Sequence, residues 1–487
     1  MTRSLTIPLL TFLAACATVD DPVPATALPA NYQTGGDGPE AASEPVDPDR
    51  RWWLAMNDPQ LTAAIEASLA QNLSIASRRA QILQAEAMVD QARAGRFPQV
   101  RLNGNVGFSR SVGAFGSITS QNASVSVPVS YELDLFARYA RSHQAAEREM
   151  EATVEDFRAA QIATSAQVAE AFYDAVFARA RVAVLTTQVE VNEQFLELVM
   201  LRFREGLVAS LDVHQQRQQT LAAKANLELA QGEVVLAEQQ LAALLGTPSL
   251  DPALAPTGRT ELPELGPAPA PGVPGALLDQ RPDVRAARKR IEAADRRVAS
   301  AIAARLPSIR LNVTPGYTWN RNEFGSDSPI GGGMPNVSSG WTFNAGATLD
   351  MPLFDGFATR AQVDVNSAQL QVQIETLQNL VITALIEVES SLVREKQLRR
   401  NVEILQSQVD VAEETLEAAR ERYRSGLSDF LPVLTAIQSS QSAELAVLQA
   451  QRNLLSARIQ LYRALGGTWP EDVELAPPPS EIREEDR

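Results

Sequence analysis

Two short segments of the chain gather charged residues around a glycine. The first holds Gly206 with Arg202, Arg204, Leu207 and Asp212, and the second holds Gly426 with Arg422, Arg424, Leu427 and Asp429. Arginines in the last turn of a helix suit its dipole, and aspartates in the first turn can cap free N–H groups. The same side chains can also form salt bridges between neighbouring helices. These residue types predict helix ends that meet other charged groups.

The single cysteine, Cys16, predicts a site of lipid attachment. A positive start at Arg3, a short apolar run and small residues before the cysteine are typical of an export signal. Leu-Ala-Ala-Cys, ending at Cys16, resembles the bacterial lipobox, in which the signal is cut before the cysteine and the cysteine is acylated, for example with palmitate. Ala17 is not the aspartate that would retain such a protein at the inner membrane. The alternative of an unmodified cysteine stays open.

Other chemistry finds little support in the sequence. His143 and His214 are the only histidines, and no second cysteine accompanies Cys16, so neither a metal site nor nucleophilic catalysis is indicated. We expect no cofactor and no enzymatic activity. The net charge of −16 argues against a nucleic-acid partner, because phosphate binding favours a basic surface.

The chain contains an internal duplication. Gly206 and Gly426 lie 220 residues apart, and the similarity continues in register to Leu245-Gly246 and Leu465-Gly466. An upstream pair of segments, beginning at Arg96 and Arg305, matches at an offset of 209 residues. The difference predicts an insertion in the second half, for which the Gly-, Ser- and Asn-rich segment 320–340 is the best candidate.

Long helices explain most of each repeat. Segments 129–205 and 357–425 contain no glycine or proline, and each predicts a helix of about 65 residues, on the order of 100 Å long. After each glycine a second helix returns, over about 212–245 and 431–465, with apolar residues that recur by sevens. Such a repeat is typical of coiled coils, so each half should form an antiparallel helical hairpin whose tip lies at Gly206 or Gly426.

The segments before the long helices alternate between apolar and polar residues. This pattern predicts four strands of about ten residues, two within 99–133 and two within 308–350, joined by loops at 109–121 and 320–340. Strands of this length with one apolar face can cross an outer membrane, although an ordinary half-buried sheet also alternates. Four strands cannot close a barrel, so the chain should oligomerise, as a dimer with eight strands or a trimer with twelve.

These features together resemble the TolC family of outer-membrane efflux proteins. Further matches are Trp52-Trp53, the segments beginning at Asp58 and Asn72, and Leu277-Leu278-Asp279-Gln280-Arg281-Pro282-Asp283-Val284, which is similar to the lipoprotein (NodT-type) drug-efflux branch. The resemblance implies a mixed α/β membrane protein, a homotrimer whose twelve-strand outer-membrane β-barrel continues into a long coiled-coil α-helical barrel in the periplasm, with a mixed equatorial domain. It also implies a periplasmic adaptor (membrane fusion protein) and an inner-membrane pump of the RND type as partners.

The resemblance gives the tip residues their roles. Salt links and acidic rings close the periplasmic end in this family, which makes candidates of Asp212, Asp429, Arg202, Arg204, Arg422 and Arg424. Pro432 occupies the position that corresponds to Asp212, so the second ring would depend on Asp429. Capping alone remains an alternative for both aspartates. The exposed residues Gly206, Leu207, Gly426 and Leu427 are the expected adaptor contacts.

The expected organisation follows from these assignments. It comprises a signal peptide at 1–15, a lipid-anchored arm at 16–49, a first repeat at 50–245 with its hairpin at 137–245, an equatorial linker at 246–282, a second repeat at 283–466 with its hairpin at 356–466, and a tail at 467–487. The implied function is a passive outer-membrane exit duct in tripartite multidrug efflux, with antibiotic resistance as its consequence. A duct for type I protein secretion and a lipid-anchored coiled-coil scaffold without a pore are the alternatives.

Overall fold

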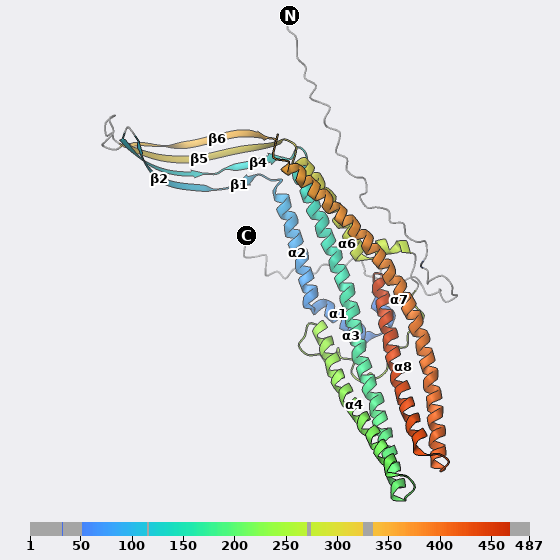
Figure 1. Cartoon of the computed structure of the whole chain (residues 1–487). Helices are drawn as coiled ribbons and strands as arrows, with labels where there is room; N and C mark the ends of the chain where they lie inside the picture. Colours follow the sequence, from blue (N-terminus) through green and yellow to red (C-terminus); the bar gives the residue numbers. More distant parts are fainter. Residues whose placement is uncertain (1–31, 33–50, 114–115, 270–273, 325–334, 468–487) are drawn as a thin grey trace. The chain divides into compact units, whose positions relative to one another are not determined.

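A computed structural model of the chain describes residue 32 and residues 51–113, 116–269, 274–324 and 335–467 (Figure 1). These residues form two compact units, each assembled from segments far apart in the sequence. One unit contains the sheet within 83–153 and 287–376, and the other contains most of the helical hairpins within 154–286 and from 377 onward. The predicted signal peptide, Cys16, the arm apart from Tyr32 and the tail beyond 467 lie outside the described residues.

The sheet is antiparallel and has four long strands (Figure 1). Its elements are β1 (Gln99–Val100), β2 (Asn103–Gly113), β3 (Gly116–Ser126), β4 (Val129–Leu133), β5 (Ser308–Phe324) and β6 (Asn336–Asp350). β1 and β2 continue one another along one edge, as do β3 and β4 beside them, and β5 joins these to β6. The second long strand is interrupted before Pro128, which has no N–H for the ladder. The edges at β2 and β6 pair with no other described strand.

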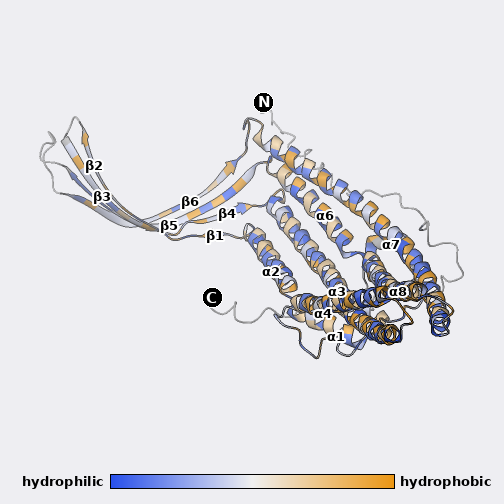
Figure 2. Cartoon of the chain, turned by 60° about the horizontal axis from the view of Figure 1, so that its bottom comes forward, coloured by the Kyte–Doolittle hydropathy of each residue, from blue (hydrophilic) through white to orange (hydrophobic). Residues whose placement is uncertain are grey.

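The two faces of the sheet differ in polarity, as Figure 2 shows along β5 and β6. One face carries apolar side chains that are more than half exposed, namely Val106, Phe108, Val125, Trp341, Phe343 and Leu349. The opposite face carries Asn105, Ser124 and Thr318 in one cross-strand row. The predicted alternation is therefore present, and the apolar face has nothing in the chain to cover it.

Two details of the predicted sheet are wrong. The loops expected at 109–121 and 320–340 are largely strand, since β2 and β3 pair as far as Gly113 with Gly116, and β5 runs to Phe324. The alternating Asn, Ser and Thr residues in these segments continue the period of the strands, although their composition is typical of loops. Tyr317 and Trp341, expected near strand ends, form an edge contact of 5.4 Å well inside β5 and β6.

The hairpin helices of the two repeats are equal in length. The helices are α3 (Arg138–Arg204) and α4 (Ser210–Leu244) in the first repeat, and α7 (Ala358–Arg424) and α8 (Phe430–Ala464) in the second. α3 and α7 each have 67 residues, and α4 and α8 each have 35, so the offset of 220 residues holds through both hairpins.

Shorter helices complete the two repeats. They are η1 (Trp52–Met56), α1 (Pro59–Gln71), α2 (Leu73–Ala94), η2 (Pro274–Ala276), α5 (Leu277–Gln280) and α6 (Pro282–Ala303). The N-cap of α1 is Asp58, whose carboxylate accepts hydrogen bonds from the N–H groups of Gln60 and Leu61. The expected linker at 246–282 thus includes η2 and α5.

The main core of the helical unit gathers around two tryptophans. Trp52 and Trp53 are buried among residues of α1, α3, α4 and α8, and the Trp52 ring stacks on Tyr462 at 5.6 Å. Trp52 Nε1 donates a 3.0 Å hydrogen bond to Ser165 Oγ. Large aromatic side chains bury much apolar area, so this cluster fixes the start of the folded chain on both hairpins.

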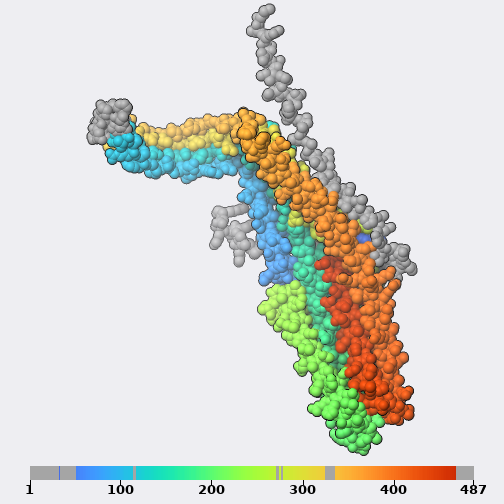
Figure 3. All heavy atoms as spheres, in the orientation of Figure 1, coloured from blue at the N-terminus to red at the C-terminus, as the bar shows by residue number. Residues whose placement is uncertain are grey.

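Two helices form the edges of the helical unit. Figure 3 shows α4 and α7 on its opposite sides, with α8 between them. α7 exposes Ile382, Ile386 and Val393, whereas the equivalent residues of α3, namely Ile162, Ala166 and Tyr173, are buried. By length and composition α7 also holds a window apolar enough to cross a membrane, with mean hydropathy 1.2. Its burial pattern favours helix packing, because the matching face of α3 is covered by protein.

Candidate functional site

Both hairpin tips use the same backbone turn. Gly206 has φ of 75°, and the N–H groups of Gly206 and Leu207 donate to the carbonyl oxygens of Phe203 and Arg202 at 3.0 and 2.9 Å. Gly426 has φ of 71° and makes the equivalent bonds at 3.1 and 2.9 Å. This is the Schellman arrangement, in which glycine adopts the left-handed conformation that ends the helix. Leu207 and Leu427 are 65% and 72% exposed at the two tips.

The two aspartates after the glycines lie in different settings. Asp212 is the third residue of α4, and its Oδ2 accepts a 3.2 Å hydrogen bond from the Ala209 N–H. Because Ala209 has no side-chain oxygen, only the carboxylate half of a capping box is present. Asp429 is the N-cap residue of α8, yet its exposed side chain makes no capping bond. The capping interpretation therefore fits Asp212 and has no contact to support it at Asp429.

Of the four predicted arginines, Arg202 joins the two hairpins of one chain. Its Nη1 donates a 2.8 Å hydrogen bond to Tyr423 O, and its guanidinium lies 4.3 Å from the centre of the Tyr423 ring. Burial raises the pKa of the Tyr423 hydroxyl above its usual value, although the charge of Arg202 acts in the opposite direction. The guanidinium thus binds a carbonyl and an aromatic face, where the sequence predicted a carboxylate.

The other three arginines point away from these contacts. Arg204, Arg422 and Arg424 are exposed and make no hydrogen bond or ion pair with any described residue. In a single chain they are available to groups outside it.

An apolar cluster beneath the tips was missed from the sequence. Phe195 and Val199 of α3 pack with Leu416 and Tyr423 of α7 and with Phe430, Val433, Leu434 and Ile437 of α8. A second arginine contact supports it, with the Arg420 guanidinium 5.0 Å from the centre of the Phe195 ring. Phe430 interrupts the similarity of the repeats, because Ser210 is its equivalent. That departure was the available signal.

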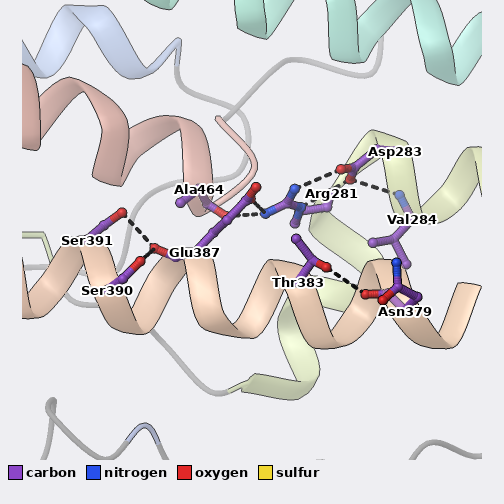
Figure 4. A network of polar contacts seen from close by, with 9 residues as sticks. All are labelled: Arg281, Asp283, Val284, Asn379, Thr383, Glu387, Ser390, Ser391 and Ala464. Carbon is purple, nitrogen blue, oxygen red and sulfur yellow. Dashed lines mark hydrogen bonds and ion pairs between the residues drawn. The ribbon is translucent and has the colours of Figure 1, made fainter.

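The Gln-Arg-Pro-Asp segment has a structural role in the helical unit (Figure 4). Arg281 is largely buried and donates to Asp283 at 2.7 Å, to Glu387 of α7 at 2.9 Å and to Ala464 O at 3.1 Å. The carbonyl of Ala464 belongs to the last turn of α8, which has no partner within the helix. Arg281 therefore ends α8 and ties it to α7 and to the linker.

Among the described residues, no group of three or more His, Cys, Asp and Glu side chains could hold a metal ion. The gathered charges instead form helix caps and salt bridges. The arrangement is suited to holding helices together and releasing them.

Comparison with known proteins places this fold. The chain is 28% identical to the pyoverdine export outer membrane protein OpmQ of Pseudomonas putida over 96% of its length and 97% of the relative's. It is 26% identical to Nodulation protein T of Rhizobium leguminosarum bv. trifolii, with 92% and 93% covered. The solved structure of the outer-membrane channel OprN superposes with a TM-score of 0.77 at 27% identity, covering 92% of this chain and 99% of the channel.

An amphipathic antiparallel sheet followed in each repeat by a long helical hairpin defines an outer-membrane channel protein. The family model described as "Outer membrane efflux protein" matches residues 64–247 and 273–467. The chain belongs to that family, as its resemblance to efflux proteins predicted.

Proposed function

We propose that this protein is the passive outer-membrane exit duct of a tripartite efflux system and carries small molecules out of the cell. Family membership and the names of its relatives support this function. The observation that carries the proposal is the sheet, which has an exposed apolar face, a polar face and two unpaired edges in one chain.

The unpaired edges favour a closed ring of copies. Each unpaired backbone group in lipid costs several kcal/mol, so membrane sheets close into barrels. Three copies with four long strands each would form the twelve-strand barrel of a trimer. In that barrel the apolar face would meet lipid, and the Asn, Ser and Thr face would line a lumen wide enough for water.

The exposed tips support a gate and a docking site. Arg204, Arg422 and Arg424 have no partner among the described residues, and Asp429 is free of capping bonds, so these charges are available to neighbouring copies. Gly206, Leu207, Gly426 and Leu427 would contact a periplasmic adaptor through their exposed apolar side chains and backbone. Energy would come from an inner-membrane pump of the RND type. A lipid on Cys16 would add a second attachment to the outer membrane.

Two measurements test this function. The purified protein should form pores in planar lipid bilayers, and a deletion strain should become sensitive to antibiotics, dyes or detergents, with complementation by the intact gene. Pores without any change in sensitivity to small molecules, together with loss of a secreted protein, would instead identify a protein-secretion duct. A protein that forms no pore would be a scaffold.

A further inference from the structure

The internal duplication makes contacts within one chain a template for contacts between chains. Within a chain, the first repeat meets the second through α3 and α8, as in the 2.6 Å bond between Asp174 and Arg452. In the proposed ring of copies, the second repeat meets the first repeat of the next chain through the equivalent helices α7 and α4. Each contact of the seam within a chain therefore has a counterpart, shifted by 220 residues, in the seam between chains.

Near the tips the seam within a chain is apolar. Phe195 of α3 packs in one buried cluster with Leu434 and Ile437 of α8, and Phe430 closes the same cluster at the start of that helix. Two arginine contacts with aromatic rings, from Arg202 and Arg420, lie over it. Separating these helices would expose several large apolar side chains to water, at a cost that scales with their area.

The counterpart between chains has small and polar residues at the same level. Thr415 replaces Phe195, and Ser210, His214 and Arg217 replace Phe430, Leu434 and Ile437. Met200 stands where Arg420 stands in the other repeat, and Thr415 offers no ring, so one of the two arginine contacts has no counterpart. Near the tips the seam between chains is therefore the weaker of the two.

Farther from the tips the polarity is reversed. Within a chain, Gln441 of α8 lies among glutamines, with its carbonyl 3.1 Å from Gln188 Nε2 and its Oε1 3.3 Å from Gln219 Nε2. The counterpart of Gln441 is Leu221, which is 59% exposed, and the counterpart of Gln219 is Ser439.

Ser439 lines a groove between α7 and α8. This groove measures about 560 Å³ and is lined by Ala412, Thr415, Leu431, Pro432, Thr435, Ala436 and Ser439. The template therefore places an exposed leucine of one chain against a largely apolar groove of the next. An apolar side chain and a groove of small residues match as a knob matches a hole.

We infer that Leu221 of each chain enters the α7/α8 groove of the neighbouring chain, and that the tips open between chains while the two hairpins of one chain stay together. The Leu221 layer acts as the fulcrum of this motion, with the weak polar seam on its tip side. The inference deepens the proposed gate and rests on the proposed function.

The contact can be tested with paired cysteines, because Cys16 is the only native cysteine. A chain carrying Leu221→Cys and Ser439→Cys, treated with a short bismaleimide, should give covalent dimers and trimers on a denaturing gel. The matched control, Gln441→Cys with Gln219→Cys, should stay at monomer mass while both thiols disappear. Only monomers from the first pair, with the control reacting, would overturn the contact.

The motion can be tested with a second matched pair and a cleavable crosslinker. His214→Cys with Thr415→Cys spans the seam between chains, and Leu434→Cys with Phe195→Cys spans its counterpart within a chain. Single-channel conductance is recorded for each variant before crosslinking, after crosslinking and after reduction. Crosslinking between chains should abolish channel opening reversibly, and crosslinking within a chain should leave the conductance of that variant unchanged.

Two results would overturn the fulcrum: a block by the link within a chain, or free opening with the link between chains in place. If no variant conducts at all, the proposed duct fails together with the motion. The gel assay then still reports whether Leu221 meets the groove, so the two failures are distinguishable.

Discussion

Arg179 and Arg399 occupy equivalent positions in the two repeats, and both donate hydrogen bonds to main-chain oxygens of the linker between the repeats. Arg179 Nη1 lies 2.8 Å from Pro256 O, and Arg399 Nη2 lies 2.8 Å from Gly266 O. Charged donors make stronger hydrogen bonds than neutral ones. The duplicated helices thus hold one linker at two points, which couples the hairpins away from their tips.

A buried ion pair beside this linker should dominate the stability of the second hairpin. Arg458 Nε lies 2.9 Å from Glu395 Oε1, both side chains are almost fully buried, and Arg458 also binds Gly266 O. Arg458→Met should lower the free energy of unfolding by about 3–5 kcal/mol, because it leaves a buried carboxylate without its partner. Urea denaturation of the purified protein measures this.

The controls for that pair use its exposed counterpart and a double variant. The Arg51–Glu66 pair is about half exposed, so Arg51→Met should cost at most about 1 kcal/mol. Replacing both Arg458 and Glu395 with apolar residues should recover much of the loss. Equal effects of Arg458→Met and Arg51→Met would contradict the importance of the buried pair.

Substitutions of the tip glycines should act through the backbone alone. A Cβ atom at Gly206 or Gly426 would meet nothing within 4 Å, but both residues have positive φ. Gly206→Ala and Gly426→Ala should each cost about 1–2 kcal/mol, and asparagine should cost less because it tolerates this conformation. Gly232→Ala is the matched control, since this helical glycine also has open space around it; we expect it to stabilise α4 by about 0.5–1 kcal/mol.

A bulky residue at either tip glycine should also abolish drug resistance while trimers still reach the membrane. Resistance assays and crosslinking of membrane fractions check this. Full resistance with tryptophan at Gly206 and Gly426 would remove the tips from the adaptor contact.

The two aspartates should separate capping from gating. Asp212→Ala should cost about 1 kcal/mol because the Ala209 N–H loses its acceptor, whereas Asp429→Ala should change stability by less than about 0.5 kcal/mol. Asp212→Asn keeps an acceptor and removes only the charge. Raised channel conductance in Asp212→Asn with unchanged thermal stability would identify a gate residue, and unchanged conductance would leave Asp212 as a helix cap.

Tyr32 should make the helical unit sensitive to alkali. Its ring is buried against Val388 and Ala464, and its hydroxyl has no hydrogen-bond partner among the described residues. Burial, assisted by the charge of Glu389, raises the pKa of Tyr32 to about 12. The neutral phenol therefore favours the folded state fully below pH 10, and this contribution is lost as the pH rises toward 12.

Tyr32→Phe tests this pH dependence directly. It should retain stability at neutral pH, or gain some because an unpaired hydroxyl is removed, and it should lose the fall between pH 10 and 12. Tyr32→Ala should cost about 3 kcal/mol at neutral pH because the cavity is not refilled. Thermal denaturation at several pH values distinguishes the variants, and identical alkaline curves for Tyr32→Phe and the unchanged protein would refute the assignment.

The elements could be predicted from the sequence, but most contacts between them could not. Heptads, alternation and the glycines at 206 and 426 depend on local chemistry, so the hairpin helices lie within two residues of their expected bounds. The loop at 109–121 was mispredicted because composition and period disagreed there, and the period prevailed.

Arg202 shows why the site was harder to predict. Its position in the last turn of a helix indicated a favourable dipole and a free charge, whereas its partner lies 221 residues away on the other hairpin. Which helices become neighbours is decided by packing, as in the cluster around Phe430. A duplicated sequence gives both repeats the same local signals and conceals that one seam is apolar and the other polar.

The free edges of the sheet have a genetic consequence. β2 and β6 are different surfaces, so in the proposed ring every chain offers one edge to each of two neighbours. A chain whose β6 edge is blocked, for example by proline at an inward N–H, still joins one neighbour through β2 and leaves the ring unclosed. Co-expression of such a chain with the normal one should poison mixed assemblies, so that a single defective allele behaves as dominant.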